Sequence, residues 1–274
     1  MFFIFGAPRS GTTLLARMLA AHPQLAIPHE TDCLVPMAFL CDRIRDPALG
    51  RRMVADLVLD SSGFAASLGE VLSRADVEDA IASAPYEPAR MADAIYARFA
   101  RHAGAEQAGD KSPNDLNFIR ILDKTGFLAA PNKVVHLVRD VRDVMASLLR
   151  TGWGGDIDRY FPRQWCHVNL YLQAAMAGQD DRYLLIRYED LVNDPASELG
   201  RACRLLGVPF SPALLEPSAR DHARYRGQEV HRNLAQPIST DGIGRFRDTL
   251  DAARIAAYER QAGEALGAFG YTTG

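Results

Sequence analysis

The segment FGAPRSGTTLL, residues 5–15, gathers residue types that bind anions near the start of this 274-residue chain. Gly6 and Gly11 have the spacing of a phosphate-binding loop, but Thr12 stands where the triphosphate-binding form of such a loop has lysine. A glycine-rich turn before a helix directs backbone N–H groups at one spot. One guanidinium and three hydroxyl groups add to them, from Arg9, Ser10, Thr12 and Thr13. The loop therefore predicts an anion site that differs from an ATP site.

A second pair of anion-binding groups lies in HLVRDVRDVMASLL, residues 136–149. Arg139 ends an apolar run, and Ser147 lies in the second turn of the predicted helix that follows, about 8 Å along its axis. An extended arginine spans that distance, so both side chains can hold one phosphate. Asp140 is the expected N-cap of this helix, and Asp143 is placed to complete a capping box. The alternative is that Arg139 and Ser147 are ordinary solvated side chains.

The elements that must position these groups are short apolar strands, each followed by a helical pattern. The expected strands are residues 2–5, 24–27, 133–138 and 183–187, and the expected helices are residues 14–21, 141–150 and 196–206. This alternation predicts an α/β fold with a central parallel sheet flanked by helices and joined by right-handed crossovers.

The region between the second and third predicted strands is helical in pattern, from Cys33 to about His102. Ser73 is the expected cap of one helix in this region, and Pro85 and Pro88 separate that helix from the next. A C-terminal helix is expected over residues 249–266. Because no repeat or linker divides the chain, residues 1–274 are expected to form a single domain with a helical insertion at 33–105.

Composition excludes several classes of protein. The chain is 48% hydrophobic and 24% charged with a formal net charge of -3, so no bulk basic surface is expected to bind nucleic acid. No apolar stretch approaches the roughly 20 residues of a membrane span. The four cysteines lack metal-site spacing, as do the histidines, and His136 falls in a strand, where a hydrogen-bonded core residue is expected. We predict reduced thiols, no metal and a cytoplasmic location, and the sequence does not indicate an oligomeric state.

The loop sequence PRSGTT resembles that of the sulfotransferases that use 3′-phosphoadenosine-5′-phosphosulfate (PAPS). The pattern R-D-x-R-x-x-x-x-S, which runs from Arg139 to Ser147, resembles the segment of this family that binds the 3′-phosphate. The resemblance implies a three-layer sandwich like that of the P-loop NTPases. It also implies that the 5′-phosphosulfate is bound by Pro8, Arg9, Ser10, Gly11, Thr12 and Thr13, and the 3′-phosphate by Arg139 and Ser147.

Three candidate catalytic residues follow from the same resemblance. AHPQLAIPHETD, residues 21–32, resembles the tyrosylprotein sulfotransferase pattern, which implies that Glu30 is the base, accompanied by Arg9. His29 is the alternative base. GDKSPND, residues 109–115, resembles the lysine segment of the family, which implies that Lys111 contacts the bridging oxygen or the sulfuryl group.

Two further segments resemble parts of the family that lie near the nucleotide. RYEDLVNDP, residues 187–195, would place Tyr188 there, although the same tyrosine could simply close the core. QPISTDGIGRF, residues 236–246, resembles the C-terminal segment that folds over the nucleotide. Phe246 replaces the tryptophan of the family, and Ser239 stands where many cytosolic members have arginine, so Arg245 is the candidate contact in this segment.

The function that the resemblance implies is transfer of a sulfuryl group from PAPS to a hydroxyl acceptor, which leaves adenosine 3′,5′-bisphosphate. A carboxylate would act as the base, no metal would be required, and the acceptor would be a small molecule, a glycan or a peptide. The helical insertion would shape the acceptor pocket. Two alternatives stay open: a P-loop kinase or NTPase, and a nucleotide-binding protein without catalysis.

Overall fold

Five parallel strands form the centre of the protein in the computed structural model, which describes residues 1–151, 156–216 and 238–273. Their order across the sheet is β2-β3-β1-β4-β5. The bounds are Phe2–Phe5 for β1, Leu25–Ala26 for β2, Gln107–Asp110 for β3, Lys133–Val138 for β4 and Tyr183–Arg187 for β5. All strands run the same way, so their carboxyl ends meet at one edge, where ligand sites of open α/β sheets lie.

Alternation along the strands builds a separate hydrophobic core on each face of the sheet. Phe3 and Phe5 of β1 belong to the core on one face, whereas Phe2 and Ile4 belong to the core on the other. Helices α1 (Thr12–Ala20), α10 (Tyr188–Asn193) and α11 (Pro195–Leu206) cover the second face. The opposite face is covered mainly by α8 (Val141–Arg150), α9 (Ile157–Ala175) and α13 (Ala252–Ala268) together with helices of the insertion. The predicted three-layer α/β sandwich is confirmed.

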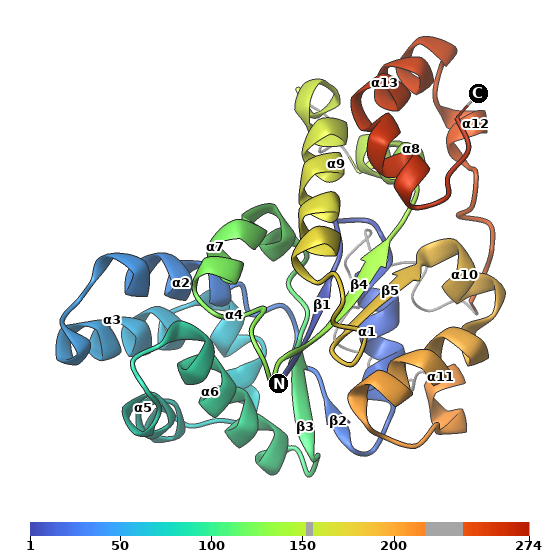
Figure 1. Ribbon diagram of the computed structural model, residues 1–274. Helices are drawn as coiled ribbons and strands as arrows, with labels where there is room; N and C mark the ends of the chain where they lie inside the picture. The colour runs from blue at the N-terminus through green and yellow to red at the C-terminus, as the bar shows by residue number, and fades with distance from the viewer. Residues whose placement is uncertain (152–155, 217–237, 274) are drawn as a thin grey trace.

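The segment between β2 and β3 is helical, as predicted, and forms a lobe on the left of Figure 1. Its α-helices are α2 (Leu34–Arg43), α3 (Pro47–Leu59), α4 (Ser62–Ala65), α5 (Arg74–Ser83) and α6 (Pro88–His102), with the 3₁₀ helix η1 at Leu68–Glu70. Ser73 caps α5 in a capping box with Asp76, and the chain breaks between α5 and α6 where the two prolines predict it.

The remaining elements connect the strands and close the C-terminal end. They are η2 (Pro113–Phe118), α7 (Ile119–Lys124), η3 (Pro212–Leu215) and α12 (Phe246–Thr249). The C-terminal helix predicted over residues 249–266 corresponds to α13 (Ala252–Ala268), and the short helix α12 precedes it. Helix α13 packs along α9 and α8 at the top of Figure 1. Gln236 and Pro237, the start of the predicted nucleotide-covering segment, lie outside the described residues.

His136 is a hydrogen-bonded core residue, as predicted, and the four cysteines also lie in the core. His136 of β4 is fully buried and hydrogen-bonds to Tyr183 Oη through Nδ1 and to Asn169 Oδ1 through Nε2, each at 2.8 Å. All four cysteines are buried and free. Across the three described ranges, no helix has the length and apolar character needed to cross a bilayer.

Candidate functional site

The predicted anion loop joins the carboxyl end of β1 to α1. Arg9 and Gly11 both have left-handed backbone conformations, with φ of 69° and 95°. The first backbone hydrogen bond of α1 runs from the N–H of Leu15 to the carbonyl of Gly11. The N–H groups of Thr12, Thr13 and Leu14 thus lie at the open end of the helix, whose first turn has no acidic residue. This geometry attracts an anion.

Space around the loop explains why both glycines are needed. A Cβ on Gly6 would lie 2.7 Å from the carbonyl oxygen of Leu137, and a Cβ on Gly11 would lie 2.5 Å from the ring of Tyr188. Gly11 therefore meets two demands, a positive φ and close approach to an aromatic ring. The loop is packed tightly between β4 and α10.

The two predicted phosphate-binding segments meet in the structure. Arg9 Nε donates a 3.0 Å hydrogen bond to Ser147 Oγ, across 138 positions of sequence. Arg139 Nη1 donates to the carbonyl of Arg9 at 2.9 Å, and its guanidinium carbon lies 4.4 Å from the centre of the Tyr188 ring. Arg9, Arg139, Ser147 and Tyr188 thus form one cluster, with the Arg9 guanidinium at Ser147.

Positive charge accumulates at this cluster. Burial, and then the nearby charges of Arg139 and Arg150, lower the pKa of Arg9 from its ordinary value. Burial, followed by the charges of Arg245 and Arg139, likewise lowers the pKa of Arg150. Arginines remain charged despite such shifts, so they favour a bound anion that would relieve their mutual repulsion.

Arg150 is a member of this cluster that the sequence reasoning missed. A signal was present, because Arg150 comes three positions after Ser147, and residues with that spacing share a helix face. Arg245, the predicted contact from the C-terminal segment, is exposed and lies close enough to Arg150 to affect its pKa.

Asp143 corrects one prediction. It does not complete a capping box with Asp140, whose backbone N–H instead donates to Glu189 Oε1 at 3.1 Å. The Asp143 carboxylate accepts from the N–H of Gly244 at 2.8 Å and from that of Phe246 at 2.9 Å. The capping box fails because this distant backbone takes both carboxylate oxygens, while Asp140 caps the helix through the N–H of Arg142.

The C-terminal segment is thereby held against α8. Arg139 Nη2 adds a hydrogen bond of 2.6 Å to the carbonyl of Gly242. Phe246 is buried, with the guanidinium groups of Arg142 and Arg247 at 4.4 and 4.6 Å from its ring centre. Ser239 lies in the described part of this segment, where its Oγ accepts from the N–H of Asp241.

The candidate catalytic residues also come together. Lys111 follows β3 and is almost fully buried, and its Nζ donates to Glu30 Oε1 and, at 3.3 Å, to Thr13 Oγ1 of the anion loop. Glu30 follows β2, and 28% of its side chain is exposed. Arg9 was the expected companion of Glu30, and the structure shows a bond from Lys111 to this carboxylate. One lysine thus links the candidate base to the loop.

The alternative base, His29, lies half-buried beside Glu30, and its carbonyl accepts from Ser67 Oγ at 2.9 Å. Asp32, two positions further on, has a left-handed backbone with φ of 49° and is exposed. Burial, and then the charge of Glu30, raises the pKa of Asp32. Strained non-glycine residues concentrate at functional sites, which agrees with the place of Asp32 here.

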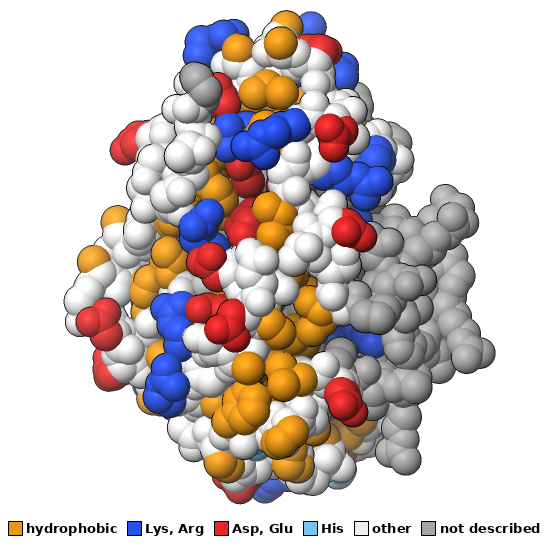
Figure 2. Space-filling model, turned by 90° about the vertical axis from the view of Figure 1, so that its right-hand side faces the viewer, with side chains coloured by type: hydrophobic (Ala, Val, Ile, Leu, Met, Phe, Trp, Pro, Cys, Tyr) orange, Lys and Arg blue, Asp and Glu red, His pale blue; other side chains and the backbone are white. Residues whose placement is uncertain are grey.

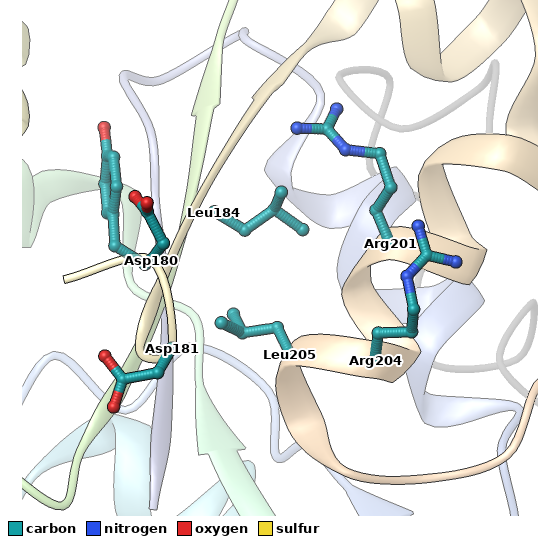
Figure 3. Close-up of a pocket in the computed structure, with 7 residues that line it drawn as sticks. Asp180, Asp181, Leu184, Arg201, Arg204 and Leu205 are labelled. Atoms are coloured by element: carbon teal, nitrogen blue, oxygen red, sulfur yellow. The ribbon is translucent and has the colours of Figure 1, made fainter. Parts of the chain in front are cut away.

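Shape alone does not locate this site. A hollow of about 280 Å³ lies at the β5 edge of the sheet. Asp180 and Asp181 lie on one side of it and Arg201 and Arg204 of α11 on the other, with Leu184 and Leu205 between them (Figure 3). None of the predicted site residues lines it. On the face shown in Figure 2, acidic and basic side chains are interspersed, in agreement with the nearly neutral composition.

The geometry can be compared with that of known proteins. The model of the sulfotransferase family matches residues 2–212, which include the anion loop, Glu30, Lys111 and the Arg139–Ser147 segment. The chain belongs to the sulfotransferase family. The sulfotransferase domain of the olefin synthase from Synechococcus PCC 7002 is 30% identical with a TM-score of 0.68, and the match covers 100% of this chain and 95% of that domain.

Other sulfotransferases match at lower identity. The sulfotransferase domain from the curacin biosynthetic pathway is 23% identical with a TM-score of 0.67, covers 100% of this chain and 98% of that domain, and shows the shared fold. The protein-tyrosine sulfotransferase of Drosophila melanogaster is 27% identical over 78% of this chain. Carbohydrate sulfotransferase 5 of Mus musculus is 27% identical over 51%. The matches span only 39% and 41% of these two relatives.

The residues of this sulfotransferase-family site fit a doubly phosphorylated nucleotide such as PAPS. Ser10 Oγ and Arg139 Nε are buried and have no hydrogen-bond partner among the described residues. Buried polar groups are normally satisfied, so these two atoms mark places where a ligand can bind. They lie in the two segments that were predicted to hold the two phosphorylated ends of the donor.

Proposed function

We propose that this chain transfers a sulfuryl group from PAPS to the hydroxyl group of an acceptor. The observation that carries the proposal is the position of Lys111, which bonds to both Glu30 and the anion-loop residue Thr13. A candidate base, a cation and an anion loop therefore meet at one edge of the sheet. Such an arrangement suits transfer of an anionic group to a hydroxyl.

The donor would be held by the loop and the arginine cluster. Residues 8–13 would bind the 5′-phosphosulfate through the hydroxyls of Ser10, Thr12 and Thr13 and the backbone N–H groups at the start of α1. Arg139, Ser147 and Arg150 would bind the 3′-phosphate, with Tyr188 and Arg245 near the nucleotide. When bound, PAPS supplies an activated sulfuryl group whose departure leaves adenosine 3′,5′-bisphosphate. Arg9 bonds to Ser147, so its guanidinium would contribute charge between the two ends.

Glu30 and Lys111 would have different roles in the transfer, Glu30 as the base and Lys111 as the cation beside the leaving oxygen. Glu30 Oε1 is bonded to Lys111, and we assign Oε2 to the acceptor hydroxyl, whose proton it takes as the new oxygen–sulfur bond forms. Lys111 would stabilise the charge that develops on the oxygen released from sulfur. The proposal includes no metal, because a sulfuryl group carries less charge than a phosphoryl group.

The proposal also covers the acceptor pocket and the cellular compartment of the protein. The insertion at 33–105 would shape the acceptor pocket of a single domain that spans residues 1–274. The acceptor would be a hydroxyl group on a small molecule, a glycan or a peptide. Four free cysteines agree with a reducing compartment such as the cytoplasm, which localisation of the tagged full chain would test.

Calorimetric titration with adenosine 3′,5′-bisphosphate tests the cofactor. We expect tight binding by the wild-type protein and at least a hundredfold weaker binding by Arg139→Ala, because a charge-assisted contact is lost. Arg201→Ala removes an arginine of α11 that bonds to Glu198 and to the carbonyl of Leu185, outside the arginine cluster, and should bind as the wild type does. Retention of binding by Arg139→Ala would contradict the assignment of the 3′-phosphate.

Assays of turnover with PAPS and of binding to ATP distinguish a sulfotransferase from the two alternative functions. Labelled PAPS with a panel of phenols, alcohols and sugars should give a sulfated product, also when a chelator is present. Binding of ATP with Mg²⁺ and indifference to the bisphosphate would instead support a kinase or NTPase. Binding of the bisphosphate without turnover on any acceptor would support a nucleotide-binding protein without catalysis.

A further inference from the structure

Three successive residues after β2 are tied to three successive residues at the end of β3. The Glu30 carboxylate bonds to Lys111, Thr31 Oγ1 donates to Asp110 Oδ1 at 2.9 Å, and the N–H of Asp32 donates to Ser112 Oγ at 3.3 Å. Only the first pair contains proposed catalytic groups. Thr31 and Asp110 are the chain neighbours of Glu30 and Lys111, and both are buried.

A third element reaches this buried pair. Tyr96 lies on α6 of the insertion, is 1% exposed, and its hydroxyl donates to the same oxygen, Asp110 Oδ1, that Thr31 uses. Cys33 Sγ donates to Thr31 Oγ1 at 3.4 Å. Each hydroxyl has one hydrogen, and both hydrogens are directed at Asp110, so the carboxylate receives two donors at one point.

We propose that Tyr96 and Thr31, through Asp110, are positioning residues that hold Glu30 and Lys111 in the geometry for proton removal. The inference rests on the proposed function. Thr31 is the neighbour of Glu30 in the chain and Asp110 is the neighbour of Lys111, so the buried hydrogen bond fixes the backbone on both sides of the catalytic pair. Tyr96 makes the position of this pair depend on α6.

Glu30 needs this support because its side chain is partly exposed to water. Part of the Glu30 side chain is in contact with water, whereas Lys111 is held by burial. An exposed side chain in a loop without a rigid backbone samples many rotamers, and catalysis requires placement within about 0.5 Å. Asp110 faces the charged or titratable groups Tyr96, Cys33, Lys111 and Asp115, and it accepts a hydrogen bond from Thr31, which precedes Asp32 and follows Glu30 in the chain.

The matched variants are Tyr96→Phe and Tyr86→Phe. Both remove a tyrosine hydroxyl from the insertion, but that of Tyr86 donates to the carbonyl of Ile44, away from the site. We expect Tyr96→Phe to lower kcat about tenfold while KM for PAPS and the affinity for the bisphosphate stay unchanged, and Tyr86→Phe to leave kcat unchanged. Thr31→Val should lose a similar factor, and Thr31→Ser should restore it.

A double-mutant cycle distinguishes positioning from general destabilisation. If Tyr96 acts through Glu30, Tyr96→Phe should have little further effect on kcat in a Glu30→Gln background. An equal loss of kcat from Tyr96→Phe in the wild-type and Glu30→Gln backgrounds would overturn the inference. The proposed function would still be upheld by turnover of the wild type. Amide hydrogen exchange gives a readout without an acceptor: Tyr96→Phe should speed exchange at residues 29–33 but not at the anion loop, and unchanged exchange at 29–33 would also overturn it.

Discussion

At the scale of single residues, chemistry depends on which side chain accepts the proton of the acceptor. Glu30 is bonded to Lys111 and adjoins the buried Thr31. On the proposed function its carboxylate is the base, and the imidazole of His29 is the alternative to be tested.

Glu30→Gln should lower kcat at least a hundredfold, because an amide cannot take the proton. The affinity for adenosine 3′,5′-bisphosphate should stay close to that of the wild type, since Glu30 is no part of the arginine cluster. Single-turnover assays with labelled PAPS measure the first effect, and calorimetry measures the second. His29→Gln is the control, and a larger loss of kcat in that variant would make His29 the base.

The residues of the anion loop could be predicted from sequence because their roles depend on neighbours in the chain. Glycines at fixed spacing, followed by hydroxyl residues and a helix, define an N–H cradle without knowledge of the rest of the fold. Asp110 and Tyr96 could not be found in this way. An aspartate beside a lysine indicates only an exposed ion pair, and their buried contact depends on how α6 packs against β3.

At the scale of elements, the C-terminal segment is held by its backbone rather than by side-chain packing alone. Asp143 of α8 binds two of its N–H groups, and Arg139 binds one of its carbonyls. The same arginine thus serves the proposed 3′-phosphate site and the segment beside it.

Asp143→Asn should weaken binding of the bisphosphate about tenfold, because the amide can accept from only one of the two N–H groups. The turnover number at saturating PAPS should change little, since Glu30 and Lys111 are not touched. Calorimetry and steady-state kinetics measure the two effects. Asp248→Asn, an exposed aspartate two positions after Phe246, serves as the control. Equal affinities for wild type and Asp143→Asn would mean that the segment contributes nothing to nucleotide binding.

Elements were predictable where their pattern was local. The strands β1, β4 and β5 are apolar runs and were predicted, but β3 has the sequence QAGD, which favours a strand poorly. It forms because β1 and β2 supply parallel partners on both sides, and because Gly109 leaves room for the ring of Phe2. Helix α9 was also missed, since Pro162 inside its pattern indicates a break.

At the scale of the whole molecule, stability should depend on pH through His136. Burial lowers the pKa of His136 to about 4, and Nε2–H donates to Asn169 Oδ1 while Nδ1 accepts from the Tyr183 hydroxyl, so the folded state holds the neutral ring. The unfolded chain binds a proton near its ordinary pKa of about 6.5. The contribution of His136 to stability is therefore complete above pH 6.5 and is lost as the pH falls toward 4.

Between pH 7.5 and pH 5 this single group should remove about 2 kcal/mol from the free energy of unfolding. Urea denaturation at the two pH values measures the net change, to which the raised pKa values of Asp143 and Glu189 contribute with the opposite sign, and NMR of the imidazole ring measures the pKa of His136 directly. His167→Gln, at an exposed histidine, should keep the pH dependence of the wild type. A ring of His136 that titrates near its ordinary pKa would contradict the prediction.

The insertion leaves the sheet after β2 and returns in β3, and these two strands are neighbours. A lobe whose two ends lie side by side can be exchanged for another without changing the order of the strands. On the proposed function, the choice of acceptor could then be transferred with the insertion alone, because the arginine cluster follows β1 and β4 and stays in place. A graft that replaces α2 to α5 but keeps Tyr96 on α6 would change what is sulfated and leave the sulfuryl donor the same.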